Sequence, residues 1–261
     1  MHPLLLKIGP IPIHTYGFMI AIGFIFAMML NRRLAVKAGL DPERAVDLTF
    51  WCVVIGFAGC RLLFVLTMWR TYLADPISIF KVWEGGLVFF GGPLAAVPFG
   101  LWYTRKFKMP FWRAMDCMIP GLVVGHFFGR FGCLGAGCCY GKPTDMPWGV
   151  RLQSELVEPA LRGIPLHPTQ LYEAASLFIL LLGLLWVFKR RLFDGQVSLT
   201  YFMAYPIIRS IIEIYRGDTI RGFVIDGVLS TSQFISIFVF AIALTALLIR
   251  LKKVQGHTLK R

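Results

Sequence analysis

Residues 171–188 read LYEAASLFILLLGLLWVF, an almost unbroken apolar run with a single acidic residue, Glu173, near its start. A helix that crosses the hydrocarbon core of a bilayer needs about 20 mostly apolar residues, within a range of about 17–25. This stretch therefore predicts a membrane-spanning helix, and six others are similar to it. The seven predicted spans are residues 11–30, 48–68, 86–103, 114–128, 171–188, 197–215 and 231–251. We expect an all-α integral membrane protein, with residues 1–261 forming one polytopic membrane domain.

The composition of the 261-residue chain supports this class. Hydrophobic residues make up 57% and charged residues 16%, whereas soluble globular chains are near 25% charged and about 45–50% apolar. This balance excludes a disordered chain, a fibrous protein and most cytosolic enzymes. Six cysteines in a chain of this length do not indicate a disulfide framework, and no Cys/His spacing matches a zinc finger. No cleavable signal peptide is expected before Tyr16.

The basic residues gather in alternate loops between the predicted spans. Cytoplasmic loops of membrane proteins collect Lys and Arg, so these loops predict an N-terminus outside, in the periplasm, and a C-terminus in the cytoplasm. The basic residues on the cytoplasmic side are Arg32, Arg33, Lys37, Arg44, Arg105, Lys106, Lys108, Arg113, Lys189, Arg190, Arg191, Arg250, Lys252, Lys253, Lys260 and Arg261. Most of the net charge of +13 is this topological bias, and we expect no nucleic-acid partner.

Four ionisable side chains lie inside the apolar stretches or at their edges: Arg61, Glu173, Arg209 and Glu213. Such residues are costly in a bilayer and indicate functional sites. Arg209 and Glu213 share a helix face and can pair, and a buried structural ion pair is one interpretation of them. Arg61 favours a second interpretation, an anion-binding site. Arginines that face one cavity need an anion, and in a membrane the natural anion is a lipid phosphate.

A second polar cluster is residues 125–141, GHFFGRFGCLGAGCCYG. On a helix His126 and Arg130 share a face, and glycines such as Gly129 let a lipid headgroup approach the backbone. A satisfied interfacial histidine and packed thiols are the alternatives, and a disulfide on the outer face is another. Cys138 with Cys139 alone makes a poor metal site, so we expect no metal.

Residues 129–170 form a long segment predicted to lie outside the cytoplasm, next to the active site. Long irregular segments in compact proteins usually carry function. The segment leads into residues 167–173, HPTQLYE, where Pro and Thr indicate the start of a helix whose N-terminus can bind an anion.

A glycine motif, residues 83–92 (WEGGLVFFGG), stands at the entrance of the third predicted span. Its glycines serve either close packing of helices or flexibility at a lipid entry point.

Five motifs occur in order along the chain: His14-Thr15-Tyr16-Gly17, Gly85-Gly86-Leu87 with Gly91-Gly92, Gly129-Arg130-Phe131-Gly132, His167-Pro168-Thr169-Gln170-Leu171-Tyr172-Glu173, and Tyr205 with Arg209 and Glu213. In this order they resemble the motifs of the bacterial phosphatidylglycerol–prolipoprotein diacylglyceryl transferases. The resemblance covers about residues 8–251. It agrees with seven spans and an outer N-terminus, and it implies a multi-pass protein of the bacterial cytoplasmic (inner) membrane.

The resemblance implies transfer of the diacylglyceryl group of phosphatidylglycerol to the thiol of the lipobox cysteine in a prolipoprotein signal peptide. A thioether forms and glycerol-1-phosphate is released. Phosphatidylglycerol, prolipoproteins and membrane lipids are the implied partners, and no metal or organic cofactor is required. The deprotonated thiol is the nucleophile, and arginines can stabilise the phosphate leaving group.

The candidate site residues follow from the motifs and the resemblance. Arg130 matches the family's signature arginine and Arg209 a second functional arginine, while His14, Tyr16 and Tyr205 match family positions. With His126 these are the candidate catalytic residues. The candidate substrate-binding residues are Arg61, Gly91, Gly92, Gly129, His167, Gln170, Tyr172, Glu173 and Glu213, and the residues with a possible thiol role are Cys133, Cys138 and Cys139.

The chain departs from the family pattern at three positions. Phe90 stands where the family has a His, a proposed base, or a Tyr. Cys133 replaces an Asn, and Cys138 lies near the position of a Glu. We therefore expect a divergent branch in which His126, or alternatively His167, takes the role of the base.

Two other functions fit the sequence. One is a related membrane transferase with another lipid or thiol acceptor, in which Cys138 or Cys139 forms a covalent intermediate. The other is a non-catalytic protein that binds lipid or peptide, or a transporter with intramembrane charges. The loss of a base at Phe90 is the main argument for a binding protein.

Overall fold

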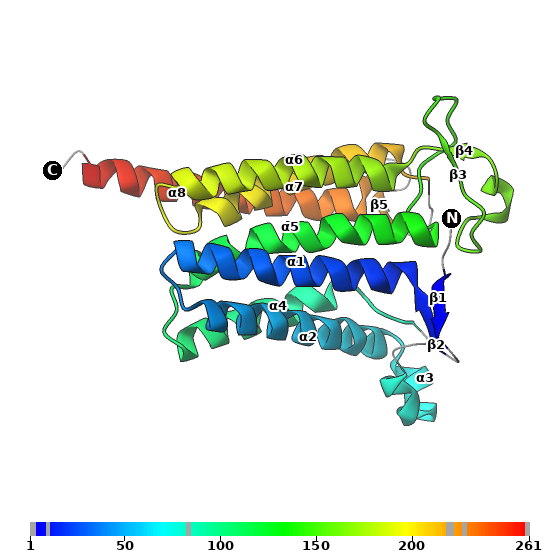
Figure 1. Cartoon of the computed structure of the whole chain (residues 1–261), viewed down its shortest axis with the longest axis horizontal. Helices are drawn as coiled ribbons and strands as arrows, with labels where there is room; N and C mark the ends of the chain where they lie inside the picture. Colours follow the sequence, from blue (N-terminus) through cyan, green and yellow to red (C-terminus); the bar gives the residue numbers. More distant parts are fainter. Residues whose placement is uncertain (1–3, 9–10, 82–84, 218–221, 226–228, 259–261) are drawn as a thin grey trace. The chain divides into compact units, whose positions relative to one another are not determined.

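The computed structural model describes residues 4–8, 11–81, 85–217, 222–225 and 229–258, and most of them are helical (Figure 1). Trp83 and Glu84 of the glycine motif, and Lys260 and Arg261 at the basic C-terminus, lie outside the described residues.

Six helices in the described part of the chain are long and apolar enough to cross a membrane. They are α1 (Thr15–Lys37), α2 (Pro42–Thr67), α5 (Phe111–Ala136), α6 (Thr169–Arg190), α7 (Gln196–Tyr215) and α8 (Thr231–Thr258, with its apolar part at Thr231–Val254). Large apolar side chains such as Ile179, Leu182 and Ile242 are more than half exposed on them. Apolar surface of this kind is stable in lipid and not in water, so the predicted class, an all-α integral membrane protein, is confirmed.

Helix α4 (Gly91–Lys106) is shorter than the span predicted over residues 86–103. Its 16 residues extend about 24 Å at about 1.5 Å per residue, less than a bilayer core of about 30 Å. Gly85 and Gly86 have φ values of 87° and 80°, which lie outside the right-handed helical region. The helix therefore starts at Gly91, and a count of seven spans stays a prediction.

The first predicted span also begins later than expected. Residues 11–14 belong to β2 (Ile11–His14), which pairs antiparallel with β1 (Leu4–Ile8). Ile11 precedes Pro12, and a residue before proline disfavours the helical conformation. Helix α1 therefore begins at Thr15, and it continues past Leu30 to Lys37.

The long segment after α5 holds only short elements. Helix α5 continues to Ala136, beyond the predicted end at residue 128. After it come β3 (Val150–Arg151), the 3-10 turn η3 (Pro159–Leu161) and β4 (Pro165–Leu166), which pairs with β3. A small apolar core of Tyr140, Leu152, Val157 and Leu166 holds this segment together. The remaining short elements are α3 (Trp69–Ala74), η1 (Pro76–Phe80), β5 (Phe223–Ile225) and β6 (Leu229–Ser230).

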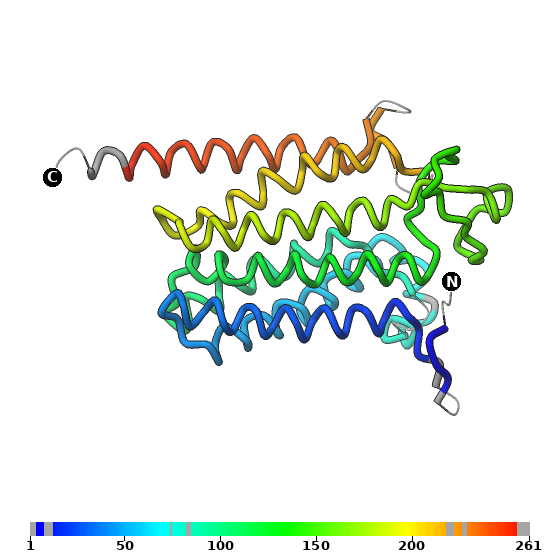
Figure 2. Tube along the Cα trace, turned by 45° about the horizontal axis from the view of Figure 1, so that its top comes forward, coloured from blue at the N-terminus to red at the C-terminus, as the bar shows by residue number. Residues whose placement is uncertain are grey.

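The chain divides into two compact units. The first comprises residues 1–30 and 119–261, and in it α6 packs on α7 and α7 on α8 (Figure 2). Phe26 of α1 stacks on Phe128 of α5, with ring centroids 5.5 Å apart. The second unit, residues 31–118, is built on the pair α2 and α4. That the whole chain forms one membrane domain stays a prediction.

Backbone contact between two glycines holds α2 and α4 together. A Cβ atom on Gly91 would overlap the carbonyl oxygen of Gly59, and a Cβ on Gly59 would overlap that of Gly91. Small residues allow such close approach between membrane helices. In this structure close packing therefore accounts for Gly91.

We predict that Gly91→Ala lowers the thermal stability of the detergent-purified protein, because the added methyl forces α2 and α4 apart. The cost of overpacking is about 1–3 kcal/mol. Gly100→Ala on the same helix is the matched control, since its Cβ would lie 3.8 Å from the Cys52 sulfur, an ordinary contact. Melting followed by circular dichroism compares the two variants. Equal melting temperatures would contradict the packing role of Gly91.

Candidate active site

The carboxylate of Glu173 is the centre of a buried polar network in the first unit. Glu173 lies in the first turns of α6 and is 1% exposed. Its Oε1 accepts hydrogen bonds from Arg130 Nη2 at 2.8 Å and from the Tyr205 hydroxyl at 3.1 Å. His126 Nε2 lies 3.4 Å from the same oxygen. The network therefore joins α5, α6 and α7.

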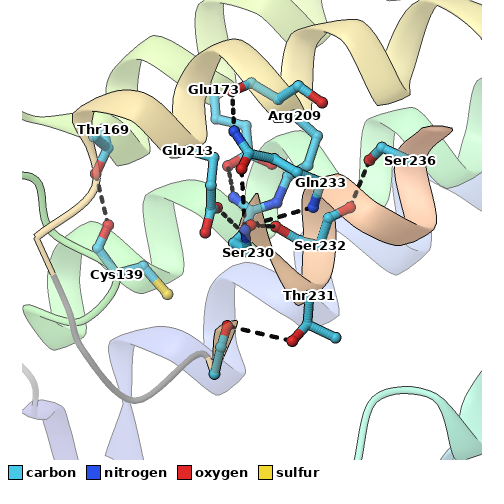
Figure 3. Close-up of polar contacts among 12 residues, drawn as sticks. Cys139, Thr169, Glu173, Arg209, Glu213, Ser230, Thr231, Ser232, Gln233 and Ser236 are labelled. Atoms are coloured by element: carbon cyan, nitrogen blue, oxygen red, sulfur yellow. Dashed lines mark hydrogen bonds and ion pairs between the residues drawn. The ribbon is translucent and has the colours of Figure 1, made fainter. Parts of the chain in front are cut away.

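A second arginine lies on the other side of this carboxylate. Arg209 Nη1 is 3.7 Å from Glu173 Oε2, and Arg209 Nη2 is 2.8 Å from Glu213 Oε2, one turn along α7 (Figure 3). The predicted pairing of Arg209 with Glu213 is therefore confirmed. Arg209 Nη1 is buried and has no hydrogen-bond partner among the described residues. A buried N–H donor without a partner is costly, and an anion would satisfy it.

His126 and Arg130 share one face of α5, as the sequence predicted. Arg130 Nε donates a hydrogen bond to His126 Nε2 at 3.2 Å, so this nitrogen carries a lone pair and can accept a proton. The imidazole ring packs on Tyr205, with centroids 5.4 Å apart. Gly129, beside Arg130, faces open space, since no atom lies within 4 Å of where its Cβ would be.

The residues at the start of α6 are held by hydrogen bonds within the first unit. Thr169 Oγ1 and Gln170 Nε2 donate to the carbonyl oxygens of Cys139 and Cys138, each at 2.7 Å. Figure 3 shows the bond between Thr169 and Cys139. Gln170 is 1% exposed, so it positions the cysteine loop in this structure. Its predicted contact with substrate stays a prediction.

His167 and Tyr172 lie in an aromatic group next to this helix start. His167 Nδ1 is 3.1 Å from the Tyr172 hydroxyl, which also accepts a hydrogen bond from Trp148 Nε1 at 2.7 Å. The His167 ring packs on Tyr215 at 5.4 Å. His167 has no bond to Glu173 or Arg130 among the hydrogen bonds of the described residues, so His126 is the histidine within the charged network.

The first predicted motif lies at the start of α1. His14 ends β2 and is exposed, and Tyr16 is 45% exposed in the first turn of α1. Tyr16 packs against α5 at Gly132, where an added Cβ would lie 3.2 Å from the Tyr16 Cα. The motif therefore reaches the helix that carries His126 and Arg130.

Arg61 belongs to the second unit and forms a different kind of site. It is 7% exposed, and all its guanidinium nitrogens donate to main-chain carbonyls. Its Nε donates to the carbonyl oxygen of Ile79, its Nη1 to those of Gly85 and Gly86, and its Nη2 to those of Ser78 and Lys81, at donor–acceptor distances of 2.6–3.4 Å. Arg61 thus holds the loop that contains the first glycine pair. Gly92, the second residue of α4, lies beside Cys60. Substrate contact by Arg61 and Gly92 stays a prediction.

The three cysteines after Arg130 are free thiols whose sulfur atoms all lie within 4.8 Å of one another. Hydrogen bonds with the thiols of Cys133 and Cys138 lower the pKa of Cys139 well below its usual range, and the guanidinium groups of Arg216 and Arg130 act in the same direction. Hydrogen bonds with Cys133 and Cys139, together with burial, raise the pKa of Cys138. The group therefore stabilises one thiolate.

Three residues near the site were not predicted. Tyr201 is buried one turn before Tyr205, and the two rings stack at 5.5 Å. Arg216, at the end of α7, is buried, and Trp148 bonds Tyr172 from the long segment. The four-residue spacing of Tyr201 and Tyr205 could have predicted their contact, because residues four apart lie on the same face of a helix. Trp148 lies 24 residues from its partner, so no local pattern connects the two.

The fold and the network define a class: a multi-pass α-helical membrane protein in which partly buried arginines and buried carboxylates meet at one site. The chain belongs to the prolipoprotein diacylglyceryl transferase family, whose model matches residues 3–249. This confirms the predicted family and the predicted enzyme class, a transferase.

Several relatives are similar over nearly their full length. Phosphatidylglycerol–prolipoprotein diacylglyceryl transferase 2 of Clostridium perfringens is 35% identical, over 96% of this chain and 95% of that protein. The transferase of Clostridium tetani is 33% identical over 94% of this chain and 96% of its own length. That of Bordetella parapertussis is 36% identical over 90% of each chain.

We predict that Glu173→Gln destabilises the protein, because it removes the buried negative charge between Arg130 and Arg209. Breaking a buried ion pair costs about 3–5 kcal/mol. Denaturant unfolding of the purified variant, followed by circular dichroism, measures the change. Glu155→Gln, on an exposed residue of the long segment, is the control and should change stability by less than about 0.5 kcal/mol. Similar losses in both variants would contradict a special role of Glu173.

Proposed function

We propose that the chain transfers the diacylglyceryl group of phosphatidylglycerol to the lipobox cysteine of prolipoprotein signal peptides and releases glycerol-1-phosphate. Family membership supports this function, since the relatives described above are named for phosphatidylglycerol and prolipoproteins. The main structural support for this function is the pair Arg130 and Arg209, whose guanidinium groups flank the Glu173 carboxylate between the helices.

The two arginines are suited to a phosphate diester in a membrane. Guanidinium groups bind phosphate oxygens through paired hydrogen bonds, and Arg209 Nη1 has a donor without a hydrogen-bond partner among the described residues. As the bond between the glyceryl carbon and the phosphate oxygen breaks, negative charge grows on the leaving group. Fixed cations stabilise this charge where water is scarce.

His126 is the proposed base for the acceptor thiol. In the structure its Nε2 is occupied by Arg130 Nε. A phosphate that attracts the Arg130 guanidinium would free this nitrogen, so donor binding and base activation are coupled through one hydrogen bond. Tyr205 and Glu173 keep the imidazole and Arg130 in place.

We also propose the finer topology that the sequence predicted. Helix α4 would be the seventh span, supported by its exposed apolar residues Leu94 and Val97. The N-terminus would lie outside and the C-terminus in the cytoplasm, because the helix ends at Lys37 and Arg190 carry basic residues. Residues 137–170, which follow the end of α5 at Ala136, would then lie on the outer side of the bacterial inner membrane.

A turnover assay tests the proposed function. The purified protein receives phosphatidylglycerol and a peptide with a lipobox cysteine, and mass spectrometry detects a diacylglyceryl group on the sulfur. A peptide with serine at that position is the control. Modified cysteine peptide with glycerol-1-phosphate is the expected result. A folded protein that binds the lipid and leaves the peptide unmodified would indicate another acceptor or a binding role.

We predict that Arg130→Ala lowers kcat/KM at least about 100-fold, since removing one group that stabilises developing charge costs about 10²–10³. Arg32→Ala is the control, because Arg32 forms an exposed ion pair with Glu43 and should leave turnover near the wild-type rate. The same peptide assay compares them. An Arg130→Ala variant with wild-type turnover would exclude Arg130 from the chemistry.

A further inference from the structure

Three cysteine thiols converge beside the proposed active site. The sulfur atoms of Cys133, Cys138 and Cys139 all lie within 4.8 Å of one another. The sequence predicts no metal site, because Cys138 and Cys139 alone are a poor ligand set. Folding adds Cys133, from the last turn of α5, as a third donor.

The backbone is bent to bring these thiols together. Gly137 has a φ of 77°, and its N–H and that of Cys138 both donate to the Cys133 carbonyl, at 2.9 and 3.1 Å. Cys139 has a φ of 61°, a left-handed conformation that non-glycine residues adopt rarely and at a cost. The hydrogen bonds from Thr169 and Gln170 hold the carbonyls of this loop on α6.

The arrangement fits the zinc ion. A zinc–sulfur distance of about 2.3 Å puts the sulfurs of a tetrahedral site about 3.8 Å apart, which is within the observed spacing. All three cysteines are partly exposed, and no fourth Cys, His, Asp or Glu joins the group within the residues that the structure describes. Three protein ligands with one open position are typical of catalytic zinc, whereas structural sites have four.

We propose that Cys133, Cys138 and Cys139 bind Zn²⁺ and that the acceptor cysteine of the substrate peptide is the fourth ligand. The metal then generates the nucleophile, since a thiol that coordinates zinc is deprotonated. This inference rests on the proposed function and adds a metal to it.

Helices α5 and α6 connect the cysteine group to the charged network. Cys133 follows Arg130 by three residues on α5, so their side chains are neighbours on one face. Thr169 and Gln170, which hold the cysteine loop, lie one turn before Glu173 on α6, and Glu173 bonds Arg130. A thiolate on the metal would therefore lie next to the arginines that hold the lipid phosphate.

Two arginines would balance the charge of the metal site. The guanidinium groups of Arg130 and Arg216 interact electrostatically with Cys139 and would balance the negative charge of a zinc–thiolate centre.

The step balances in atoms and charge. The acceptor thiol coordinates zinc and gives its proton to His126 Nε2. Its sulfur attacks the glyceryl carbon of phosphatidylglycerol, a sulfur–carbon bond forms, and the carbon–oxygen bond breaks with its electron pair on the phosphate oxygen. The products are a thioether and glycerol-1-phosphate. A neutral thioether binds zinc more weakly than a thiolate, so the product leaves the metal.

Cobalt binding tests the metal site without turnover. The reduced, chelator-treated full-length protein is titrated with Co²⁺, a spectroscopic substitute for zinc. We expect one ion per chain, a thiolate-to-cobalt charge-transfer band, and displacement by Zn²⁺. Cys133→Ser, Cys138→Ser and Cys139→Ser should each weaken binding more than about 100-fold, while Cys52→Ser on α2 should bind as wild type. Wild-type protein in which Cys133, Cys138 and Cys139 are free thiols and which gives no thiolate–cobalt band would overturn the proposal. A disulfide among these three cysteines in the untreated protein would overturn it as well.

The fourth ligand is tested by adding peptide to the cobalt protein. A lipobox peptide with cysteine should change the visible cobalt spectrum, and the serine peptide should leave it unchanged. Equal responses to both peptides would overturn thiol coordination.

Turnover measured with and without zinc distinguishes a failure of the zinc proposal from a failure of the proposed function. Removal of zinc should lower the rate at least about 100-fold, and added zinc should restore it. Equal rates with and without zinc would overturn the zinc proposal and leave the proposed function intact. If neither form modifies the peptide while the cobalt spectrum still responds to the cysteine peptide, the metal site stands and the proposed lipid donor is wrong.

Discussion

The buried carboxylate of Glu173 is the constraint on which the site depends. An ionised carboxylate inside a membrane protein is stable only when cations and hydrogen-bond donors surround it. Arg130 comes from α5, and Arg209 and Tyr205 from α7, so their bonds to Glu173 fix the relative rotation of three helices. The same bonds gather two arginines at one point, where Glu173 and Glu213 balance their charge, and guanidinium groups placed together can bind a phosphate.

The cysteine loop depends on the same helices. Helix α6 begins with Thr169 and Gln170, which bind the loop carbonyls, and continues to Glu173, which binds Arg130. One helix start therefore sets both the thiols and the charged network. In this account the arginines bind the lipid phosphate, and the metal ionises the acceptor thiol.

The sequence predicted most of the membrane architecture, because long apolar runs have few alternatives to a spanning helix. It also predicted that His126 and Arg130 share a face, since that needs only helical spacing. It could not predict the bonds from Arg61 to the carbonyls of its loop, which depend on how that loop folds back. The sequence indicated a possible thiol role for Cys133, Cys138 and Cys139, but it could not predict that the three converge, because this requires the left-handed turn at Gly137 and Cys139.

The central claim is that Arg130 and Arg209 hold the phosphate of the lipid donor. An experimental structure of the protein in a lipid nanodisc with phosphatidylglycerol tests it most directly. We expect the phosphate oxygens within hydrogen-bond distance of both guanidinium groups, with Arg130 Nε moved from His126. A lipid phosphate bound elsewhere, with the bond from Arg130 Nε to His126 intact, would contradict the account.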